Sequence, residues 1–518
     1  MNRGTGIKAW LFSVICLCVL VFAMVPAPVS AQEESKQANV LLVYDSLGLG
    51  TSAAGNVEAL QRLLLSFGVK VTAIAADEYD SGMAQADPNH KLITVCNTDD
   101  LCGGITHIQY AGDWLHIGPV PPERIQERLG LQTKTIARQS LKLMVEGISQ
   151  DVFMERVTRI SEGKGQAFGR MVTANDHIEA PLGLVADGNA YVPYFEPGNV
   201  SEMAIAYVLK EWLGAEGSGQ AHLLIRGITP FVDLDRLEDL SKQLYEAGIP
   251  FLVSVSTLFN NMDSPAMKRY TDALHTVQSY NGGILVEVPT PVSDRQDLED
   301  MKAQMDHFLN QLFEAGIAPL GMTGEVRKAE ENTMREAGFA FSDTIVLLPN
   351  EKASSPEQDA VQPFPSSPYS MLGEDLLQVS HENKIWPVFP LDVVVTFNWF
   401  ESEDKQEETV QKLVSSWLPF ADFKSGSHNL ASSLHKAESL HGALLLDGQP
   451  ADLQEQAVSA EDAVPVPPAQ AEGIDRLFSV QSRVLIVIIV TTLMLFAVFL
   501  VIGYRMYKRK YYNSGGSL

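Results

Sequence analysis

The sequence predicts an α/β protein: an N-terminal doubly wound parallel sheet, a second α/β region, and one C-terminal transmembrane helix. Three observations carry this prediction. Residues 38–75 read as strand, loop, helix and strand, and strands alternate with helices from about residue 221 onward. Residues 484–504 form an uncharged apolar run. Alternation of this kind is typical of parallel sheets, and about 20 apolar residues span a bilayer core.

The N-terminus has the features of a secretory signal peptide. Arg3 and Lys8 precede an apolar run over residues 9–25, and Val29-Ser30-Ala31 supplies small residues for cleavage. The sequence therefore predicts a signal peptide over residues 1–31, cleaved after Ala31. An uncleaved anchor helix is the alternative.

Residues 38–130 are predicted to form a flavodoxin-like α/β domain. Residues 38–44 are a short apolar run typical of a buried strand, and a helix is expected over 56–67. The loop between them begins at Asp45 and lies where doubly wound folds bind ligands, so Asp45 is a ligand-binding candidate. The loop lacks the G-x-G-x-x-G spacing, so a dinucleotide is not supported, and a plain crossover loop is the alternative.

Residues 131–215 are predicted to be a β-rich connecting region. Asp187-Gly188 is typical of a hairpin turn. Residues 175–179 (Asn-Asp-His-Ile-Glu) combine residue types that bind metals, but a solvated loop is the favoured interpretation.

Residues 220–440 are predicted to be a second α/β region. The expected strands cover residues 222–225, 251–255, 283–288, 318–322 and 342–348, with helices between them. A final strand is expected within residues 388–397. This order fits either a parallel sheet or a (β/α) barrel.

The C-terminal segment predicts where the protein resides. Residues 448–475 are rich in Ala, Pro, Gln and acidic residues and predict a flexible stalk. The apolar run 484–504 is followed by a basic tail, residues 505–518, which marks the cytoplasmic side. The expected location is the cell membrane, with a single span and an extracellular ectodomain.

Composition excludes some classes of function. The chain is 46% hydrophobic and carries a formal net charge of −26, so nucleic acid is not an expected partner. The GxxxxGK[ST] phosphate loop and zinc-ligand spacings are absent, and we expect no cofactor and no metal. Cys96 and Cys102 remain after the signal peptide and form either one small disulfide loop or two free thiols.

Several segments resemble the polysaccharide deacetylase-like (NodB-homology) superfamily, in a branch found on exported Gram-positive proteins with a flavodoxin-like N-terminal part. The matching segments are Tyr44-Asp45, residues 224–230 (LIRGITP), residues 245–251 (YEAGIPF), residues 282–285 (GGIL) and residues 316–321 (GIAPLG). The resemblance covers about residues 38 to 400. It implies that residues 220–440 form a deacetylase-like (β/α) barrel with a function in carbohydrate metabolism.

The sequence departs from this superfamily at the catalytic motifs. In the superfamily an Asp acts as base, and a neighbouring Asp with two His residues holds a divalent metal, which activates water. Here Gly227-Ile228-Thr229 replaces the acidic pair, and Val286 and Thr290 occupy the two His positions. The resemblance therefore implies a barrel without catalytic residues.

Five residues remain as candidates in this region. Glu287 and Glu325 are fallback catalytic residues, because each ends an expected strand and two carboxylates can do acid–base work. Asp233 is a third fallback, although a helix cap explains it better. Arg226 and Trp386 are ligand-binding candidates, with an ion pair and core packing as their alternatives.

We carry three functional hypotheses forward. The first is a catalytically inactive, deacetylase-like surface protein that binds or organises cell-surface glycan. The second is an active carbohydrate hydrolase or deacetylase with a rearranged carboxylate site. The third is an accessory subunit of a membrane-bound machine that makes or exports exopolysaccharide.

Overall fold

The computed structural model describes residues 38–80, 82–83, 90–98, 102–257, 264–289, 295–330, 334–350, 356, 360–381 and 388–451. The predicted signal peptide, most of the stalk, the transmembrane span, the basic tail and Trp386 lie outside these residues. Within the described residues, no helix is both long and apolar enough to cross a membrane.

The N-terminal part is built on a ten-stranded mixed sheet, of which five neighbouring strands are parallel. In sheet order these strands are β2 (Lys70–Ala75), β1 (Asn39–Tyr44), β3 (His90–Val95), β4 (Trp114–Ile117) and β9 (Asn189–Val192). The β1–β2 and β1–β3 ladders run in register from Asn39 to Tyr44. The order β2-β1-β3-β4 is that of flavodoxin-like folds, with the switch point between β1 and β3.

Helices cover both faces of these parallel strands. On one face lie α2 (Asn56–Ser66) and α6 (Val200–Leu213), which pack on alternate strand residues such as Leu42. On the other lie α4 (Cys102–Thr106) and α5 (Glu123–Leu129), which pack on residues such as Leu41. Because the strands are buried on both faces, they read in the sequence as continuous apolar runs.

The predicted β-rich region, residues 131–215, contributes strands to this same sheet. Antiparallel strands continue beyond β9 in the order β8 (Glu179–Ala186), β7 (Gln166–Thr173), β5 (Gln132–Val145), β6 (Ile148–Glu162) and β16 (Ser380–His381). The β8–β9 hairpin turns at Asp187 and Gly188, which have φ of 48° and 72°. Positive φ at both positions is the geometry for which the Asp-Gly pair is suited.

The second α/β region is a closed barrel of seven strands, which decides between the barrel and the open sheet. Each barrel strand pairs with the next barrel strand along the chain, and the last strand pairs with the first to close the barrel. All seven ladders are parallel. The strands are β10 (Ala221–Ile228), β11 (Phe251–Ser256), β12 (Gly283–Glu287), β13 (Gly321–Glu325), β14 (Ile345–Leu348), β15 (Tyr369–Leu372) and β17 (Val393–Asn398).

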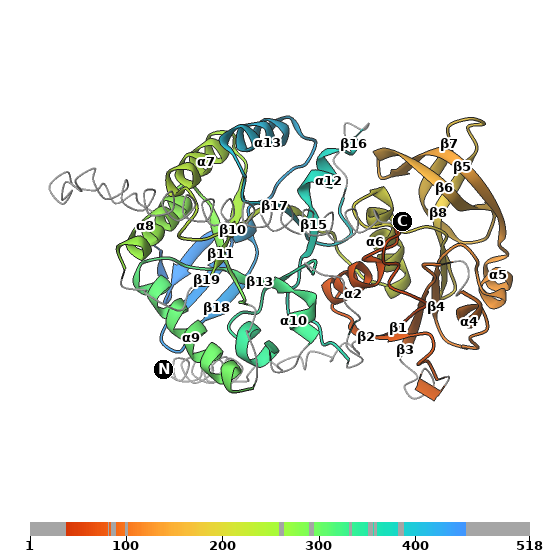
Figure 1. Cartoon of the computed structure of the whole chain (residues 1–518), viewed down its shortest axis with the longest axis horizontal. Helices are drawn as coiled ribbons and strands as arrows, with labels where there is room; N and C mark the ends of the chain where they lie inside the picture. Colours follow the sequence, from red (N-terminus) through yellow and green to blue (C-terminus); the bar gives the residue numbers. More distant parts are fainter. Residues whose placement is uncertain are drawn as a thin grey trace, which may run out of the picture. The chain divides into compact units, whose positions relative to one another are not determined.

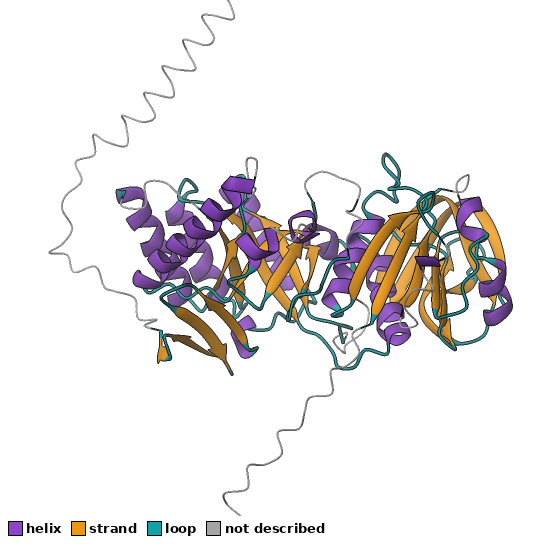
Figure 2. Ribbon diagram, turned by 90° about the horizontal axis from the view of Figure 1, so that it is seen from below, coloured by secondary structure: helices purple, strands orange, loops and turns teal. Residues whose placement is uncertain are grey.

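Helices surround the barrel strands, as Figures 1 and 2 show. They are α7 (Leu234–Glu246), α8 (Pro265–Ser279), α9 (Arg295–Glu314), α10 (Val326–Glu330), the π-helix η1 (Arg335–Phe339), α12 (Gly373–Leu377) and α13 (Glu403–Ser415). After the barrel, the 3-10 helix η2 (Phe423–Ser425) leads into a small antiparallel sheet. Its strands are β18 (His428–Ala431), β19 (Lys436–Leu440), β20 (Ala443–Leu446) and β21 (Gln449–Pro450).

Helix α2 of the N-terminal part packs against the barrel at a weak point in the strand ladder. In the described residues, a single pair, Leu347 with Tyr369, joins β14 to β15. Arg62 of α2 donates to the carbonyl oxygen of Ser370 at 2.7 Å and to its Oγ at 2.9 Å. Its guanidinium also lies 4.8 Å from the centre of the Tyr369 ring. Arg62 therefore supplies polar contacts where the two barrel strands hardly pair.

Candidate functional site

The carboxyl ends of the barrel strands form the first candidate site, which we call the barrel mouth. Ser254 of β11 and Thr323 of β13 are fully buried, and their hydroxyl oxygens lie 2.8 Å apart. Because β12 separates these strands, this contact crosses the barrel interior. Side chains alternate along a strand, so Ser256 and Glu325, two residues further on, also face inward, at the end where such barrels carry active sites.

Glu287 faces inward with them. It is paired with Ser256 on one side and with Thr323 on the other. The Ser256 hydroxyl donates to Glu287 Oε2 at 3.3 Å. Strand spacing and rise place the Cα atoms of Glu287 and Glu325 about 8 Å apart. The structure thus brings both predicted carboxylates, each half-buried, to the same barrel mouth.

Val286 points the other way. It is paired with Val255 and fully buried, on the outer face of the strand. The residue of β12 that faces the mouth is therefore Glu287. It lies one position after Val286, the residue that the sequence resemblance placed at one of the two His positions. At this strand end the inward-facing group is a carboxylate.

Two basic side chains accompany these carboxylates. Arg226 is paired with Asn398 at the ends of β10 and β17, and alternation from the inward-facing Leu224 directs it into the mouth. The ladder shifts between Ile225 and Ile228, where Gly227 has a φ of 77°. Lys328 of α10 is buried, and its Nζ donates to the carbonyl oxygen of Val288 at 3.0 Å. The mouth therefore combines two carboxylates with two cations.

A small hollow of about 20 Å³ lies between α2 and the loop after β1 on one side and α10 and the loop after β14 on the other. Glu58 of α2 accepts from the backbone N–H of Asn350 at 3.1 Å and lies 3.3 Å from Arg62 Nε. Gln61 Nε2 donates to Glu330 Oε1 at 3.0 Å. The hollow is lined by polar groups from both parts of the chain.

Burial shifts the pKa of a carboxyl group that lines the hollow. Desolvation raises the pKa of the Glu58 carboxyl, the neighbouring Arg62 opposes this rise, and the negative charge of Glu325 adds to it.

The structure places Asp233 and Trp386 elsewhere. Asp233 is the N-cap of α7, and its carboxylate accepts from the backbone N–H of Arg236 at 3.1 Å. This confirms the capping interpretation of Asp233. Trp386 lies outside the described residues, so its role stays a prediction.

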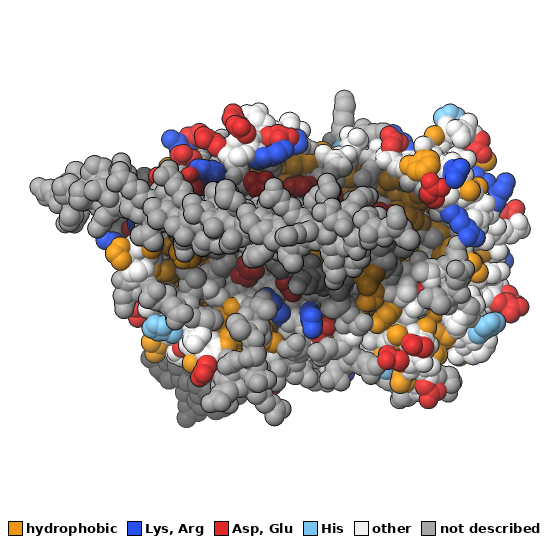
Figure 3. Space-filling view, in the orientation of Figure 1, with side chains coloured by type: hydrophobic (Ala, Val, Ile, Leu, Met, Phe, Trp, Pro, Cys, Tyr) orange, Lys and Arg blue, Asp and Glu red, His pale blue; other side chains and the backbone are white. Residues whose placement is uncertain are grey.

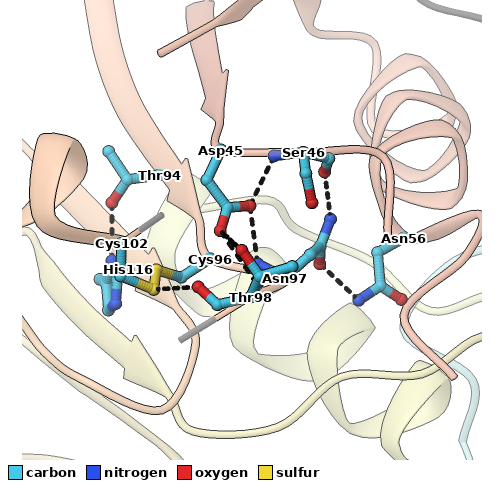
Figure 4. The surroundings of a disulfide bond; sticks show 9 residues. All are labelled: Asp45, Ser46, Asn56, Thr94, Cys96, Asn97, Thr98, Cys102 and His116. Carbon is cyan, nitrogen blue, oxygen red and sulfur yellow. Dashed lines mark hydrogen bonds between the residues drawn. A yellow bond between two sulfur atoms is a disulfide. The ribbon is translucent and has the colours of Figure 1, made fainter. Parts of the chain in front are cut away.

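Asp45 lies at the switch point of the sheet (Figure 4). Its carboxylate accepts from the backbone N–H groups of Ser46, Asn97 and Thr98 at 2.6, 2.8 and 2.9 Å, and from the Thr98 hydroxyl at 3.1 Å. Four donors fill most of its acceptor capacity. Asp45 therefore fastens the loop after β1 to the loop after β3.

Cys96 and Cys102 are joined as a disulfide beside Asp45, with their Cα atoms 5.5 Å apart (Figure 4). Asp45, Cys96 and Cys102 are also the group of potential metal ligands that lie close together in the described part of the chain. The sulfur atoms are bonded to each other and the carboxylate already accepts four hydrogen bonds, so this set does not fit a metal ion.

Sequence reasoning missed the groups that the tertiary fold contributes. Glu58, Gln61 and Glu330 come from helices that are far apart in the chain. Lys328 is an ordinary helical Lys in the sequence, and only its burial beside Val288 sets it apart. No local pattern in the sequence could have connected these residues.

Comparisons with known proteins give no family for this chain. No family model matches it, and no curated protein matches it. Among solved structures, a family 4 carbohydrate esterase from Bacillus anthracis is similar at 9% identity and a TM-score of 0.21, covering 42% of this chain and 88% of the esterase. Phospho-2-dehydro-3-deoxyheptonate aldolase from Thermotoga maritima is similar at 12% identity and a TM-score of 0.20, covering 54% and 96%.

Proposed function

We propose that this protein is a membrane-anchored, extracytoplasmic carbohydrate-binding protein with a deacetylase-like barrel, and that glycan binds at the barrel mouth. The observation that carries the proposal is the convergence of Ser256, Glu287 and Glu325 on the carboxyl ends of adjacent strands, facing inward. Carboxylates and hydroxyls are suitable partners for sugar hydroxyl groups, because a carboxylate accepts hydrogen bonds and a hydroxyl both donates and accepts them.

The inactive character of the proposed site rests on the residues at the strand ends. The segment Gly227-Ile228-Thr229 follows Arg226 where the resembling family has its acidic pair. On β12, the outward-facing Val286 and the inward-facing Glu287 leave no imidazole at the strand end. A partner in a membrane-bound glycan assembly, reached through the predicted anchor 484–504, is part of the same proposal.

The test is glycan binding by the full-length protein in detergent. We expect the wild-type protein to bind oligosaccharides on a glycan array, and Glu287→Gln and Glu325→Gln each to weaken binding by about tenfold. Asp233→Asn is the matched control, because it removes a carboxylate outside the mouth and keeps the helix cap. Equal binding by wild type and both glutamate variants would show that glycan does not bind at the mouth.

Metal content gives a second, independent test of the inactive character. The full-length protein is dialysed against trace Zn²⁺, Co²⁺ and Mn²⁺ and then measured by elemental analysis. We expect no stoichiometric metal. One metal ion per chain would contradict the proposal and would direct attention to deacetylase activity.

The presence of two carboxylates at the mouth is compatible with a second candidate function, a glycoside hydrolase. Carboxylate pairs in such enzymes are separated by about 5–5.5 Å or about 6.5–9.5 Å, and the estimate of about 8 Å between Cα atoms allows either. Release of reducing ends from a bound oligosaccharide, abolished in Glu287→Gln, would favour this candidate. Binding without release would favour the carbohydrate-binding function.

A further inference from the structure

The hairpin of β5 and β6 contains a two-stranded ribbon that is open along one edge. Residues 132–145 of β5 pair with residues 148–162 of β6, but the ladder between β5 and β7 covers only residues 141–144 of β5. In the described structure, residues 132–140 thus have a strand neighbour on one side only. This open edge is about 30 Å long at about 3.3 Å per residue.

Two cations lie directly opposite each other on this ribbon. Lys134 of β5 is paired with Arg159 of β6. The next pair, Thr135 with Thr158, has its hydroxyl oxygens 3.3 Å apart, which agrees with this register. The Cβ atoms of directly opposite residues lie about 5 Å apart, and both side chains project from the same face of the ribbon. Like charges in such a pair are destabilising.

Arg159 is also buried without a hydrogen-bonding partner. The residue is 8% exposed, and its Nε is enclosed with no partner in the described structure. The terminal nitrogens are not among the enclosed atoms and form no hydrogen bond or ion pair in the described structure, so they reach the surface. A guanidinium that is largely removed from water without a partner is unfavourable, which points to a missing anion.

Neighbouring cations of the same strands have partners. Arg138 pairs with Glu155 at 3.3 Å, and Arg170 of β7 pairs with Glu179 of β8 at 3.4 Å. The Thr173 hydroxyl donates to Asp176 and lowers the pKa of this carboxyl most, and the charge of Arg159 adds a smaller lowering from a distance. Lys134 and Arg159 therefore have no direct anionic partner in the described structure, in a chain with a net charge of −26.

We propose that Lys134 and Arg159 form a binding site for an oxyanion, the carboxylate or phosphate group of an acidic polymer. A guanidinium presents a planar fork that matches either group, and the Lys134 ammonium adds a second positive charge from the opposite strand. Figure 3 shows Lys and Arg side chains grouped where Figure 1 labels β5 to β8. The open edge of β5 lets an extended chain lie beside the ribbon.

This inference does not depend on the proposed function. The barrel mouth is lined by Glu287 and Glu325, whereas the ribbon site is cationic and belongs to the other part of the chain. Loss of glycan binding at the mouth would leave the ribbon site untouched.

The experiment measures binding of the full-length protein to two polymers, polygalacturonate for carboxylate and polyphosphate for phosphate. Neutral dextran is the negative probe. We expect binding to at least one acidic polymer, weakened about tenfold in both Arg159→Gln and Lys134→Gln, and weakened by added salt. Arg170→Gln is the matched control, since it removes one cation of the same sheet that already has a partner.

Thermal unfolding separates loss of a site from loss of the fold. Because Arg159 has no partner to leave behind, Arg159→Gln should keep the melting temperature of the wild-type protein. Equal binding by Arg159→Gln and wild type, an equal loss in Arg170→Gln, or a lowered melting temperature that explains the loss would each overturn the proposal. Binding to phosphatidylglycerol vesicles but to neither polymer would also overturn it, in favour of a membrane surface.

Discussion

His116 of β4 is a fully buried imidazole beside the disulfide region of the sheet (Figure 4). Trp114 Nε1 donates to Thr94 Oγ1 at 2.9 Å, so the Thr94 hydroxyl hydrogen is free to point at His116 Nδ1, 2.8 Å away. Burial lowers the pKa of His116 from 6.5 to about 3. The ring is therefore neutral in the folded protein across the physiological range.

The lowered pKa of His116 predicts acid sensitivity. Below pH 6.5 the unfolded chain takes up a proton that the folded protein excludes until about pH 3. The stabilisation is thus complete above pH 6.5 and is lost as the pH falls, by about 1.4 kcal/mol per pH unit. We expect His116→Asn, which keeps an acceptor near the Thr94 hydroxyl, to remove this slope in urea unfolding measured between these pH values. The exposed His177→Asn is the control, and equal slopes in wild type and His116→Asn would contradict the prediction.

At the scale of elements, α7 shows how a local signal fixes a helix end. Asp233 accepts from the backbone N–H of Arg236 at 3.1 Å, which satisfies one of the first free donors of the helix. We expect Asp233→Ala to lower the free energy of unfolding by about 1 kcal/mol, because the cap is lost. Asp233→Asn should remain close to wild type, because Asn also caps. A chemical denaturation series measures both, and a large loss in Asp233→Asn would show that the charge itself is needed.

Elements with local signals were predictable, and elements defined by distant partners were not. The apolar run at residues 39–44 and the Asp187-Gly188 turn both appear in the structure as the sequence predicted. The short strand β16, Ser380–His381, exists because it pairs with Ile148 and Ser149 of β6, more than 200 residues earlier. Its own sequence has no strand pattern. Likewise, β15 is only four residues long and follows a Pro- and Ser-rich segment, and its strand partners come from β14 and β17.

At the scale of the whole molecule, the described residues between 38 and 451 belong to one compact unit. One hydrophobic core cluster contains residues from α2 and α6 and also from every barrel strand. Polar groups extend this junction, because the Tyr369 hydroxyl donates to the buried Glu202 of α6. The candidate site follows the same logic. Glu287 and Glu325 could be predicted from strand ends, but Glu58 and Glu330 line one hollow only because the two parts share a core.

This shared core predicts that the sheet and the barrel unfold together. Calorimetry of the full-length protein should show a single transition for these two parts. The calorimetric enthalpy of that transition should equal its van't Hoff enthalpy. Arg62 is 4% exposed, donates across the junction to Ser370 and pairs with the half-buried Glu58, so Arg62→Ala removes both interactions. We expect a loss of about 1–3 kcal/mol in the free energy of unfolding, because buried Ser370 loses a charged donor.

Lys405→Ala is the matched control for this experiment, because Lys405 is 66% exposed in its pair with Glu408 and water screens such pairs, so its loss should leave stability nearly unchanged. Two resolved transitions in the wild-type protein would mean that the sheet and the barrel are independent folding units. A change of under about 1 kcal/mol in Arg62→Ala would mean that the apolar core alone holds the junction. A single wild-type transition that splits in Arg62→Ala would instead identify Arg62 as the residue that couples the sheet to the weakly paired β14–β15 edge of the barrel.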